Sequence, residues 1–321
     1  MRVEQGKRSA ESPETSEYAL HSAIRSEADP LRQVTASLVR WRGTAAAPDD
    51  DELTVEEPVE LRVGQGAIGG AGSQGGAQVA MGETLAVIMR TPGHDEELAA
   101  GFLYGEGLIT RCDEIAALRP GLDADGLPSP NVIAIATPPG IDLAQRAHEA
   151  GYSRQFAVNA SCGVCGKNSV ASACATLPPL PLDGFTVAPQ TLYALPDRLR
   201  AGQRVFRFTG GLHAAGLFDG AGVLLALRED VGRHNAVDKL IGRALLDDAL
   251  PTLRQRILLV SGRLSFEIVL KALAAGIPIL AAVSAPSSLA VDLANSGGVT
   301  LVAFLRGEAM NVYTHPQRIR Q

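Results

Sequence analysis

From Gly222 to Arg306 the chain alternates between two kinds of apolar pattern. Short continuous apolar runs, typical of buried strands, alternate with longer runs whose apolar residues recur at helical spacing. Strands alternating with helices in this way predict a parallel sheet with right-handed crossovers and helices on both faces. The strands are expected within 222–230, 256–262, 278–284 and 300–306, and the helices within 235–246, 266–276 and 287–298.

The preceding part of the chain predicts a smaller α+β domain over residues 51–155. Alternation from Leu53 to Arg62 indicates strands, and a further strand is expected to end near Met89. A helix should begin at the acidic residues 95–97 and stop at Gly105 and Gly107. Residues 132–137 read as a buried strand, 190–202 as a helix, and 205–219 as a strand pair around two glycines, Gly210 and Gly211.

Two segments are expected to lie outside the packed domains. Residues 1–50 are polar, charged and dotted with proline, which is typical of a disordered tail. Residues 64–78 are rich in glycine and predict a flexible insertion between strands. No GK[ST] follows them, so they are not interpreted as a phosphate-binding loop.

Composition and charge narrow the class of protein. The net charge of −6 argues against a broad nucleic-acid surface. The sequence has no apolar run long enough for a membrane span and no apolar stretch of a signal peptide at its start, so we expect a cytoplasmic protein that does not enter a membrane. With four cysteines in 321 residues, reduced thiols are expected rather than a disulfide framework. Cys112 and Cys174 stand alone and are interpreted as packing residues.

The remaining two cysteines form the strongest chemical signal. Cys162 and Cys165 lie in NASCGVCGK, residues 159–167, with glycines and Lys167 close by. Two thiols at this spacing can share a metal, exchange a disulfide or pass a sulfur atom, and each role needs the thiolate. A helix beginning near Ser169 would point backbone donors toward them. The spacing alone leaves these roles open, with half of a structural zinc site as the plain alternative.

A second candidate site lies where the predicted parallel strands end. Ligands bind beyond the carboxyl ends of such strands. Polar segments occur there at 229–235, at Ser261 to Arg263, at Ser284 and at Arg306 to Glu308. Arginines and helix N-termini together suit an anionic ligand with phosphates. The alternative is that these residues have no ligand: Arg233 could pair with Asp238 and Arg306 with Glu308 at the surface, and His234 could be a histidine with its hydrogen bonds satisfied. Tyr313 and His315 either line the pocket or seal the C-terminus.

Several motifs together resemble one family. NASCGVCGK, TGGLHAAGLF, REDVGRHNAVDKLIG, VSGRLSFEIVLKALAAGIPILAAVSAPSSLAVDLA and FLRGEAMNVYTHPQRI occur in the order found in the formate dehydrogenase accessory sulfurtransferases, the FdhD family. The resemblance runs from about Leu53 to the C-terminus. It implies a cytidine-deaminase-like fold for the catalytic domain, here 156–321, which carries the CxxC segment.

The resemblance also implies a function. A sulfurtransferase of this family takes persulfide sulfur from a cysteine desulfurase and transfers it to molybdenum in a bis-molybdopterin guanine dinucleotide cofactor, which then goes to apo-formate dehydrogenase. The cofactor would be a bound substrate, with no tightly bound metal of the protein's own, and we expect a homodimer. Cys162 would carry the persulfide with Cys165 as its partner. The cofactor-binding segment would be Phe304, Leu305, Arg306, Gly307, Glu308 and Ala309, to which the strand ends add Ser261 and Arg263.

Three other activities are weighed against this reading. A zinc deaminase needs His-x-Glu and PCxxC, but Ala214 and Ala215 follow His213, and no proline precedes Cys162. A zinc-stabilised scaffold, perhaps with His213 as a further ligand, stays open. A dithiol oxidoreductase also stays open, although the W-C-x-x-C context of thioredoxins is absent.

Overall fold

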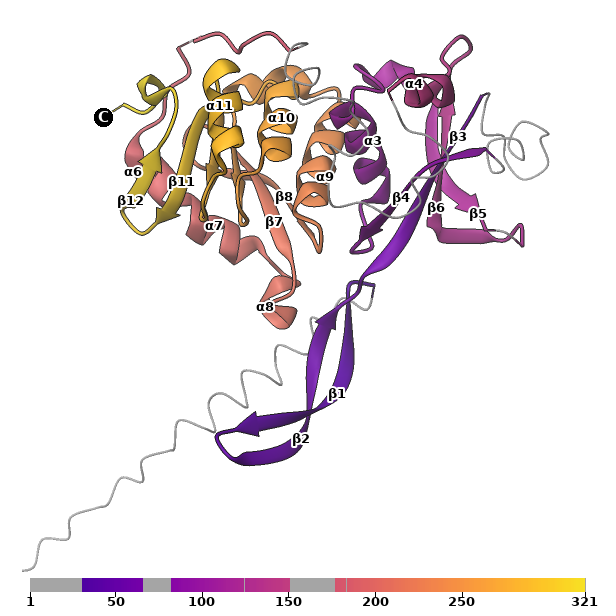
Figure 1. Ribbon diagram of the computed structural model, residues 1–321, viewed down its shortest axis with the longest axis horizontal. Coiled ribbons are helices and arrows are strands. Elements are labelled where there is room, and N and C mark those ends of the chain that lie inside the picture. The colour runs from indigo at the N-terminus through magenta and orange to yellow at the C-terminus, as the bar shows by residue number, and fades with distance from the viewer. Residues whose placement is uncertain (1–30, 66–81, 124, 151–176, 183, 321) are drawn as a thin grey trace, which may run out of the picture.

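The computed structural model describes residues 31–65, 82–123, 125–150, 177–182 and 184–320 (Figure 1). Two packed lobes lie side by side, and a β-hairpin projects away from them. The domain boundary expected near residue 155 and most of the glycine-rich insertion lie outside the described residues.

The larger lobe is built on a six-stranded sheet in the order β12-β11-β10-β9-β7-β8. Strands β9, β10 and β11 are parallel, as expected, but β7 runs antiparallel between β9 and β8, and β12 runs antiparallel beside β11. Because β7 is antiparallel to both β8 and β9, the four expected strands β8, β9, β10 and β11 all run in one direction. The sheet as a whole is mixed, since the short turns 219–223 and 307–308 join β7 and β12 to their neighbours as hairpins. The strands are β7 (His213–Phe218), β8 (Leu224–Asp230), β9 (Ile257–Val260), β10 (Ile279–Ala282), β11 (Thr300–Arg306) and β12 (Ala309–Val312).

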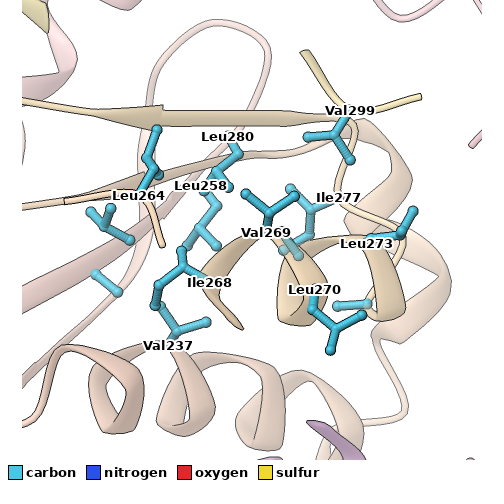
Figure 2. Packing of buried hydrophobic residues seen from close by; sticks show 14 of the residues in the cluster. Val237, Leu258, Leu264, Ile268, Val269, Leu270, Leu273, Ile277, Leu280 and Val299 are labelled. Carbon is cyan, nitrogen blue, oxygen red and sulfur yellow. The ribbon is translucent and has the colours of Figure 1, made fainter. Parts of the chain in front are cut away.

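Helices cover both faces of this sheet, as the pattern predicted. Along β9, Leu258 and Val260 belong to the core on one face, while Ile257 and Leu259 belong to the core on the other. Figure 2 shows Val237, Leu258 and Ile268 in the first of these cores. That face carries α9 (Arg233–Leu246), α10 (Phe266–Ala274) and α11 (Ser288–Ser296), and the other carries α6 (Pro189–Tyr193) and α7 (Leu195–Gly202).

Two local expectations in this lobe need correction. The helix expected over 190–202 is two short helices, and Pro196 lies in the first turn of the second. The strand pair expected around Gly210 is a helical turn, α8 (Phe206–Thr209), followed by β7. Glu229 explains this turn, because its carboxylate accepts the backbone N–H groups of Val205 and Phe206 at 3.1 and 2.8 Å.

The smaller lobe has a four-stranded sheet in the order β4-β3-β6-β5. Two helices pack against the apolar side chains of this sheet in one core. The helix expected after residue 94 contributes Leu98 and Leu103, and a later helix contributes Leu143. The elements are β3 (Glu57–Gln65), β4 (Glu83–Arg90), α3 (Asp95–Gly105), β5 (Ala117–Leu122), β6 (Pro128–Thr137) and α4 (Leu143–Glu149). The described residues of the two lobes also form 3-10 helices at η2 (Cys112–Glu114), η3 (Leu250–Gln255) and η4 (Pro316–Arg318).

The lobes join where α3 crosses α9. A Cβ atom on Gly101 would lie 1.9 Å from the carbonyl oxygen of Asp238, and one on Gly242 would lie 1.8 Å from that of Glu97. The two helices therefore touch backbone to backbone, which only glycine permits at these positions.

The projecting hairpin corrects the expectation of a disordered tail to residue 50. Strands β1 (Gln33–Arg42) and β2 (Ala45–Thr54) pair antiparallel over their whole length, from Gln33 with Thr54 to Arg42 with Ala45. We call residues 33–54 the arm. The sequence of β2 is polar and shows no strand pattern of its own. It forms a strand by pairing with β1, whose residues lie up to 21 positions away, so local sequence could not predict it.

Candidate functional site

Backbone hydrogen bonds tie several strand ends into one continuous edge. The N–H of Ser261 donates to the carbonyl of Ala214 at 2.9 Å, and that of Leu264 donates to Ala285 at 3.1 Å. The N–H of Phe304 donates to Ser284 at 3.2 Å. We call this edge, formed by residues 211–214, 261–264, 284–287 and 303–309, the rim.

Ser261 and Arg263 lie at the centre of the rim. The Ser261 hydroxyl oxygen accepts the N–H of Ala214 at 2.9 Å, so it holds two strands together and keeps its own proton for another partner. Arg263 is exposed. Between them, Gly262 leaves its would-be Cβ position 3.4 Å from His213 Nδ1 and 3.7 Å from Arg233 Cδ, so these side chains converge here.

Arg233 provides the charge at this point. It is the first residue of α9, and its Nε is buried without a hydrogen-bond partner among the described residues. Burial and the neighbouring Arg233 lower the pKa of His213, and burial lowers the pKa of His234 to about 4. His234 Nε2 lies 3.2 Å from Ser265 Oγ. Both imidazoles are therefore neutral at pH 7, and the guanidinium is the cation that an anion would meet.

Two helices begin at the rim without a side-chain cap. No side chain caps α9 after Gly232 or α10 after Ser265, whereas the Ser287 hydroxyl caps α11 by accepting the N–H of Ala290 at 3.3 Å. Free N–H groups and the helix dipole at such ends attract anions. Together with Arg233 they make the central rim positive.

The segment Phe304 to Ala309 lies at the end of the rim. The register of β11 and β12 shifts between Ala303 and Arg306, and Phe304 and Gly307 have φ of 53° and 52°. Leu305 is fully buried, while the other five residues, Gly307 among them, are exposed. One strand, β10, separates this segment from Ser261, a spacing of about 10 Å. The structure thus brings both expected cofactor-binding groups onto one edge, at neighbouring positions rather than in contact.

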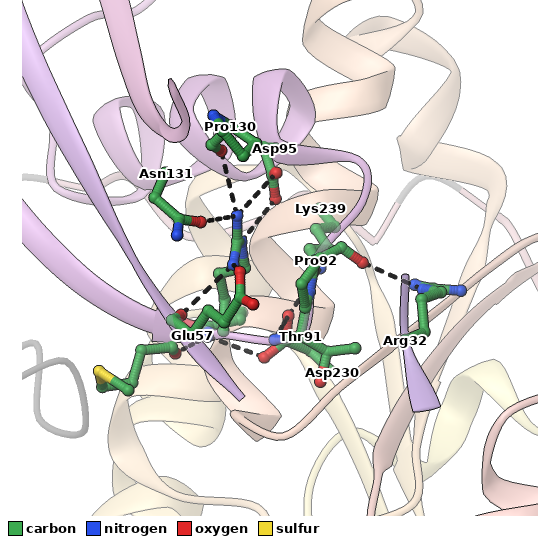
Figure 3. A network of polar contacts seen from close by, with 12 residues as sticks. Arg32, Glu57, Thr91, Pro92, Asp95, Pro130, Asn131, Asp230 and Lys239 are labelled. Atoms are coloured by element: carbon green, nitrogen blue, oxygen red, sulfur yellow. Dashed lines mark hydrogen bonds and ion pairs between the residues drawn. The ribbon is translucent and has the colours of Figure 1, made fainter. Parts of the chain in front are cut away.

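A buried ionic network stands behind the rim (Figure 3). Lys239 Nζ lies 2.6 Å from Asp230 Oδ2 and donates to the carbonyl of Thr91 at 2.8 Å, and both charged side chains are fully buried. Asp230 Oδ1 also accepts the N–H of Gly232 at 2.8 Å and the amide of Asn235 at 2.9 Å. The network fixes the turn from which α9 and Arg233 start.

Sequence reasoning missed this network and misassigned a neighbour. The proposed surface pair of Arg233 with Asp238 is wrong, since Asp238 is buried and lies 2.7 Å from the Nζ of Lys271, which is also buried. Lys239 and Lys271 are both charged residues that the pattern alone places toward water. The α3 helix covers the second face of α9, and this contact between distant segments buries them.

The expected catalytic pair lies elsewhere in the chain. Cys162 and Cys165, with Lys167 and the helix expected from Ser169, lie outside the described residues. Within the described part, Cys112 is half-buried, and burial raises the pKa of its thiol. That part contains no group of three or more His, Cys, Asp or Glu residues placed to hold a metal ion. None of its helices is long and apolar enough to cross a membrane.

Comparisons with known proteins agree with one another. A model described as the FdhD/NarQ family matches residues 77–320. Proteins named "Sulfur carrier protein FdhD" are similar: that of Streptomyces avermitilis is 48% identical over 291 residues, 88% of this chain and 94% of its own length. That of Mycobacterium tuberculosis is 48% identical over 84% of this chain and 92% of its own, and that of Sulfurisphaera tokodaii 42% identical over 87% and 95%.

The fold is also similar to a solved structure. A protein from Desulfotalea psychrophila, described as a formate dehydrogenase accessory protein, superposes with a TM-score of 0.65 at 24% identity. The match covers 90% of this chain and all of the other.

Proposed function

Because the chain belongs to the FdhD/NarQ family, we propose that it is a sulfur carrier, which holds one sulfane sulfur as a persulfide on Cys162. The family match over residues 77–320 carries the proposal, since it includes the CxxC segment and the rim together. We further propose that a cysteine desulfurase supplies the sulfur and that molybdenum in a bis-molybdopterin guanine dinucleotide cofactor, bound as substrate, receives it for apo-formate dehydrogenase. We also propose a cytoplasmic location, because this chemistry needs reduced thiols.

Loading follows thiol chemistry. The Cys162 thiolate attacks the outer sulfur of a persulfide on the donor, the donor's S–S bond breaks, and the donor cysteine leaves as a thiolate. One neutral sulfur moves and no electrons are lost. Lys167, two residues beyond Cys165, favours the thiolate by its positive charge.

Release uses the second cysteine. The Cys165 thiolate attacks the inner sulfur of the persulfide on Cys162 and expels hydrosulfide, which passes to the metal of the substrate cofactor. The two cysteines are left as a disulfide, which a cellular dithiol reduces before the next cycle. Cys162→Ala therefore abolishes loading, whereas Cys165→Ala permits loading and slows release.

The rim supplies the groups that a nucleotide-bearing cofactor needs. Next to it, the buried Arg233 Nε and the uncapped starts of α9 and α10 suit a diphosphate. The exposed Arg263 follows β9, and the exposed Arg306 ends β11 two strands further along the sheet. We propose that Ser261, Arg263 and the segment from Phe304 to Ala309 contact the guanine dinucleotide portion.

Mass spectrometry tests the carrier function. After incubation with a cysteine desulfurase and cysteine, the wild-type protein should gain the mass of one sulfur atom, and a reductant should remove it. Cys162→Ala should show no gain. Cys112→Ala is the matched control and should load normally, because burial raises the pKa of that thiol. An unchanged wild-type mass, or equal loading of Cys162→Ala, contradicts the proposal.

Calorimetric titration with guanosine diphosphate tests the rim separately. Arg306→Ala and Arg263→Ala should each weaken binding about tenfold or more, since a charge-assisted hydrogen bond contributes about 1.5–3 kcal/mol. Arg243→Ala, which removes an exposed arginine at the far end of α9, should bind normally. Equal affinities for guanosine diphosphate in all three variants would contradict the proposal that the rim binds the cofactor.

A further inference from the structure

One buried side chain, at the point where the arm joins the lobes, has no hydrogen-bond partner for either of its polar atoms. Gln33 is the first residue of β1 and is only 5% exposed. Its Oε1 and Nε2 are both buried and unpaired among the described residues. A buried amide without partners costs free energy, whereas a leucine of similar volume would occupy the same space without that cost. We therefore expect this amide to serve a ligand.

The pairing of β1 with β2 shows which way Gln33 points. Gln33 lies directly opposite Thr54, so the two side chains share one face of the arm, with their Cβ atoms about 5 Å apart. Thr54 Oγ1 lies 2.8 Å from Thr209 Oγ1 of α8, and a Cβ atom on Gly211 would lie 2.8 Å from the same Thr54 oxygen. The Gln33 amide is therefore on the side of the arm that meets the end of α8, where the rim begins.

The preceding residue fixes the backbone of Gln33 against both lobes. Arg32 Nε donates to the carbonyl of Pro92 at 3.1 Å (Figure 3). Its Nη2 donates to the carbonyl of Glu229 at 3.3 Å, and its own carbonyl accepts the N–H of Val55 at 2.9 Å. Gln33 is thus held in place by contacts that do not use its side chain, which is the arrangement expected of a preorganised binding group.

The position of Gln33 suits the base of a nucleotide whose phosphates lie at Arg233. At most about 7 Å of extended chain separates Gly211 from His213. His213 and Arg233 in turn converge beside Gly262. A carboxamide offers one acceptor beside one donor. Guanine and pterin rings carry the matching lactam edge, an N–H donor beside a C=O acceptor, and in a nucleotide one sugar separates such a ring from the phosphates.

Building on the cofactor site proposed above, we propose that Gln33 is a specificity-determining residue that binds the lactam edge of a guanine base. Its Oε1 accepts the N1–H of the base, and its Nε2 donates to O6. The diphosphate of the same nucleotide then lies toward Arg233 and the start of α9. The arm thereby contributes a residue to the cofactor site, and the bound base satisfies both unpaired groups of the amide.

Calorimetric titration with guanosine diphosphate and its N1-methyl derivative tests this contact. The methyl group removes the N1 donor, so the wild type should bind the derivative about tenfold or more weakly than guanosine diphosphate. Gln33→Leu should bind guanosine diphosphate about tenfold or more weakly than the wild type, and it should bind the two nucleotides alike. Gln145→Leu, which replaces an exposed glutamine on α4, is the matched control and should behave as the wild type.

Two further ligands show which part of the cofactor Gln33 contacts. Inorganic pyrophosphate has no base, so Gln33→Leu should bind it as tightly as the wild type. Equal losses of affinity for pyrophosphate and guanosine diphosphate would mean that Gln33 acts through the shape of the rim, and would overturn the proposal. Pterin-6-carboxylate carries the same lactam edge on a different ring. If Gln33→Leu weakens the binding of this pterin but leaves that of guanosine diphosphate unchanged, the assignment to guanine is overturned.

Urea unfolding and sedimentation separate a ligand-binding amide from a structural one. Because leucine removes an unpaired buried amide, Gln33→Leu should unfold at the same urea concentration as the wild type or at a higher one. A lower urea midpoint, or an altered sedimentation coefficient, would mean that the amide stabilises the fold or a subunit contact, and would overturn the proposal.

The same titrations distinguish failure of this inference from failure of the proposed function. An unchanged affinity of Gln33→Leu for guanosine diphosphate overturns the role of Gln33 and leaves the rim as the cofactor site. A wild type that does not bind guanosine diphosphate overturns both. The carrier function is tested apart from either, by the mass that the wild-type protein gains when Cys162 is loaded with sulfur.

Discussion

Lys239→Met tests whether the buried ion pair holds the two lobes in register. The substitution keeps the length of the side chain and removes the ammonium group that contacts Asp230 Oδ2 at 2.6 Å and the Thr91 carbonyl at 2.8 Å. Asp230 then keeps its negative charge in a fully buried position.

The expected loss can be worked from this geometry. Removing one partner of a buried ion pair costs about 3–5 kcal/mol, because the other charge is left uncompensated. Asp230 retains the N–H of Gly232 and the amide of Asn235 as donors, so we expect the lower end of that range. Asp230→Asn/Lys239→Met removes both charges and should recover part of the loss.

Urea unfolding followed by circular dichroism measures these effects. The control is Arg243→Ala on the same helix, where an exposed ion pair with Asp247 should contribute only about 0.3–0.5 kcal/mol. A loss below about 1 kcal/mol for Lys239→Met, or strict additivity in the double variant, would refute the reasoning, since the pair would then not be coupled.

Two further predictions concern the lobe contact and the rim. Gly101→Ala should destabilise the protein by about 3 kcal/mol in urea unfolding, because its Cβ would lie 1.9 Å from the Asp238 carbonyl oxygen. Gly107 has φ +72° and open space around it, so the control Gly107→Ala should destabilise the protein by only about 1 kcal/mol. Equal losses in the two variants would contradict the packing argument. For His234, the pKa is lowered to about 4, so the folded state resists the proton that the unfolded state takes up near pH 6.5. The contribution of neutral His234 to the free energy of unfolding is present above pH 6.5 and is lost as the pH falls toward 4, by at most about 3 kcal/mol. His234→Gln should therefore flatten the dependence of stability on pH over that range. An unchanged slope would mean that another group titrates there.

Local patterns predicted several of the regular elements well. The spacing of Val237, Leu240 and Ile241 placed α9 correctly, and the acidic start and glycine end of α3 were also confirmed. Local patterns could not predict the contacts between segments that are distant in the sequence. Strand β7 enters the sheet between β8 and β9 through hairpin pairing, and the AAAPDDD run in β2 is a strand only because β1 lies beside it.

The candidate site divides in the same way. The strand ends predicted the rim and the positions of Ser261 and Arg306 on it, because the direction of a strand follows from the order of elements. Phe304 was expected only from the family resemblance. Arg233 was considered but paired with the wrong residue, since the burial of Asp238 depends on α3 and α10. No sequence signal near Lys239 indicated its role, because its carboxylate partner is nine positions earlier and its carbonyl partner 148 positions earlier.

The crossing of α3 over α9 limits how the molecule can change shape. Where two helices meet through side chains, they can slide by exchanging rotamers, but here main chain rests on main chain at Gly101 and Gly242. A clamshell motion about this joint would have to separate the helices altogether. We therefore expect both lobes to move as a single body when a bulky cargo binds at the rim.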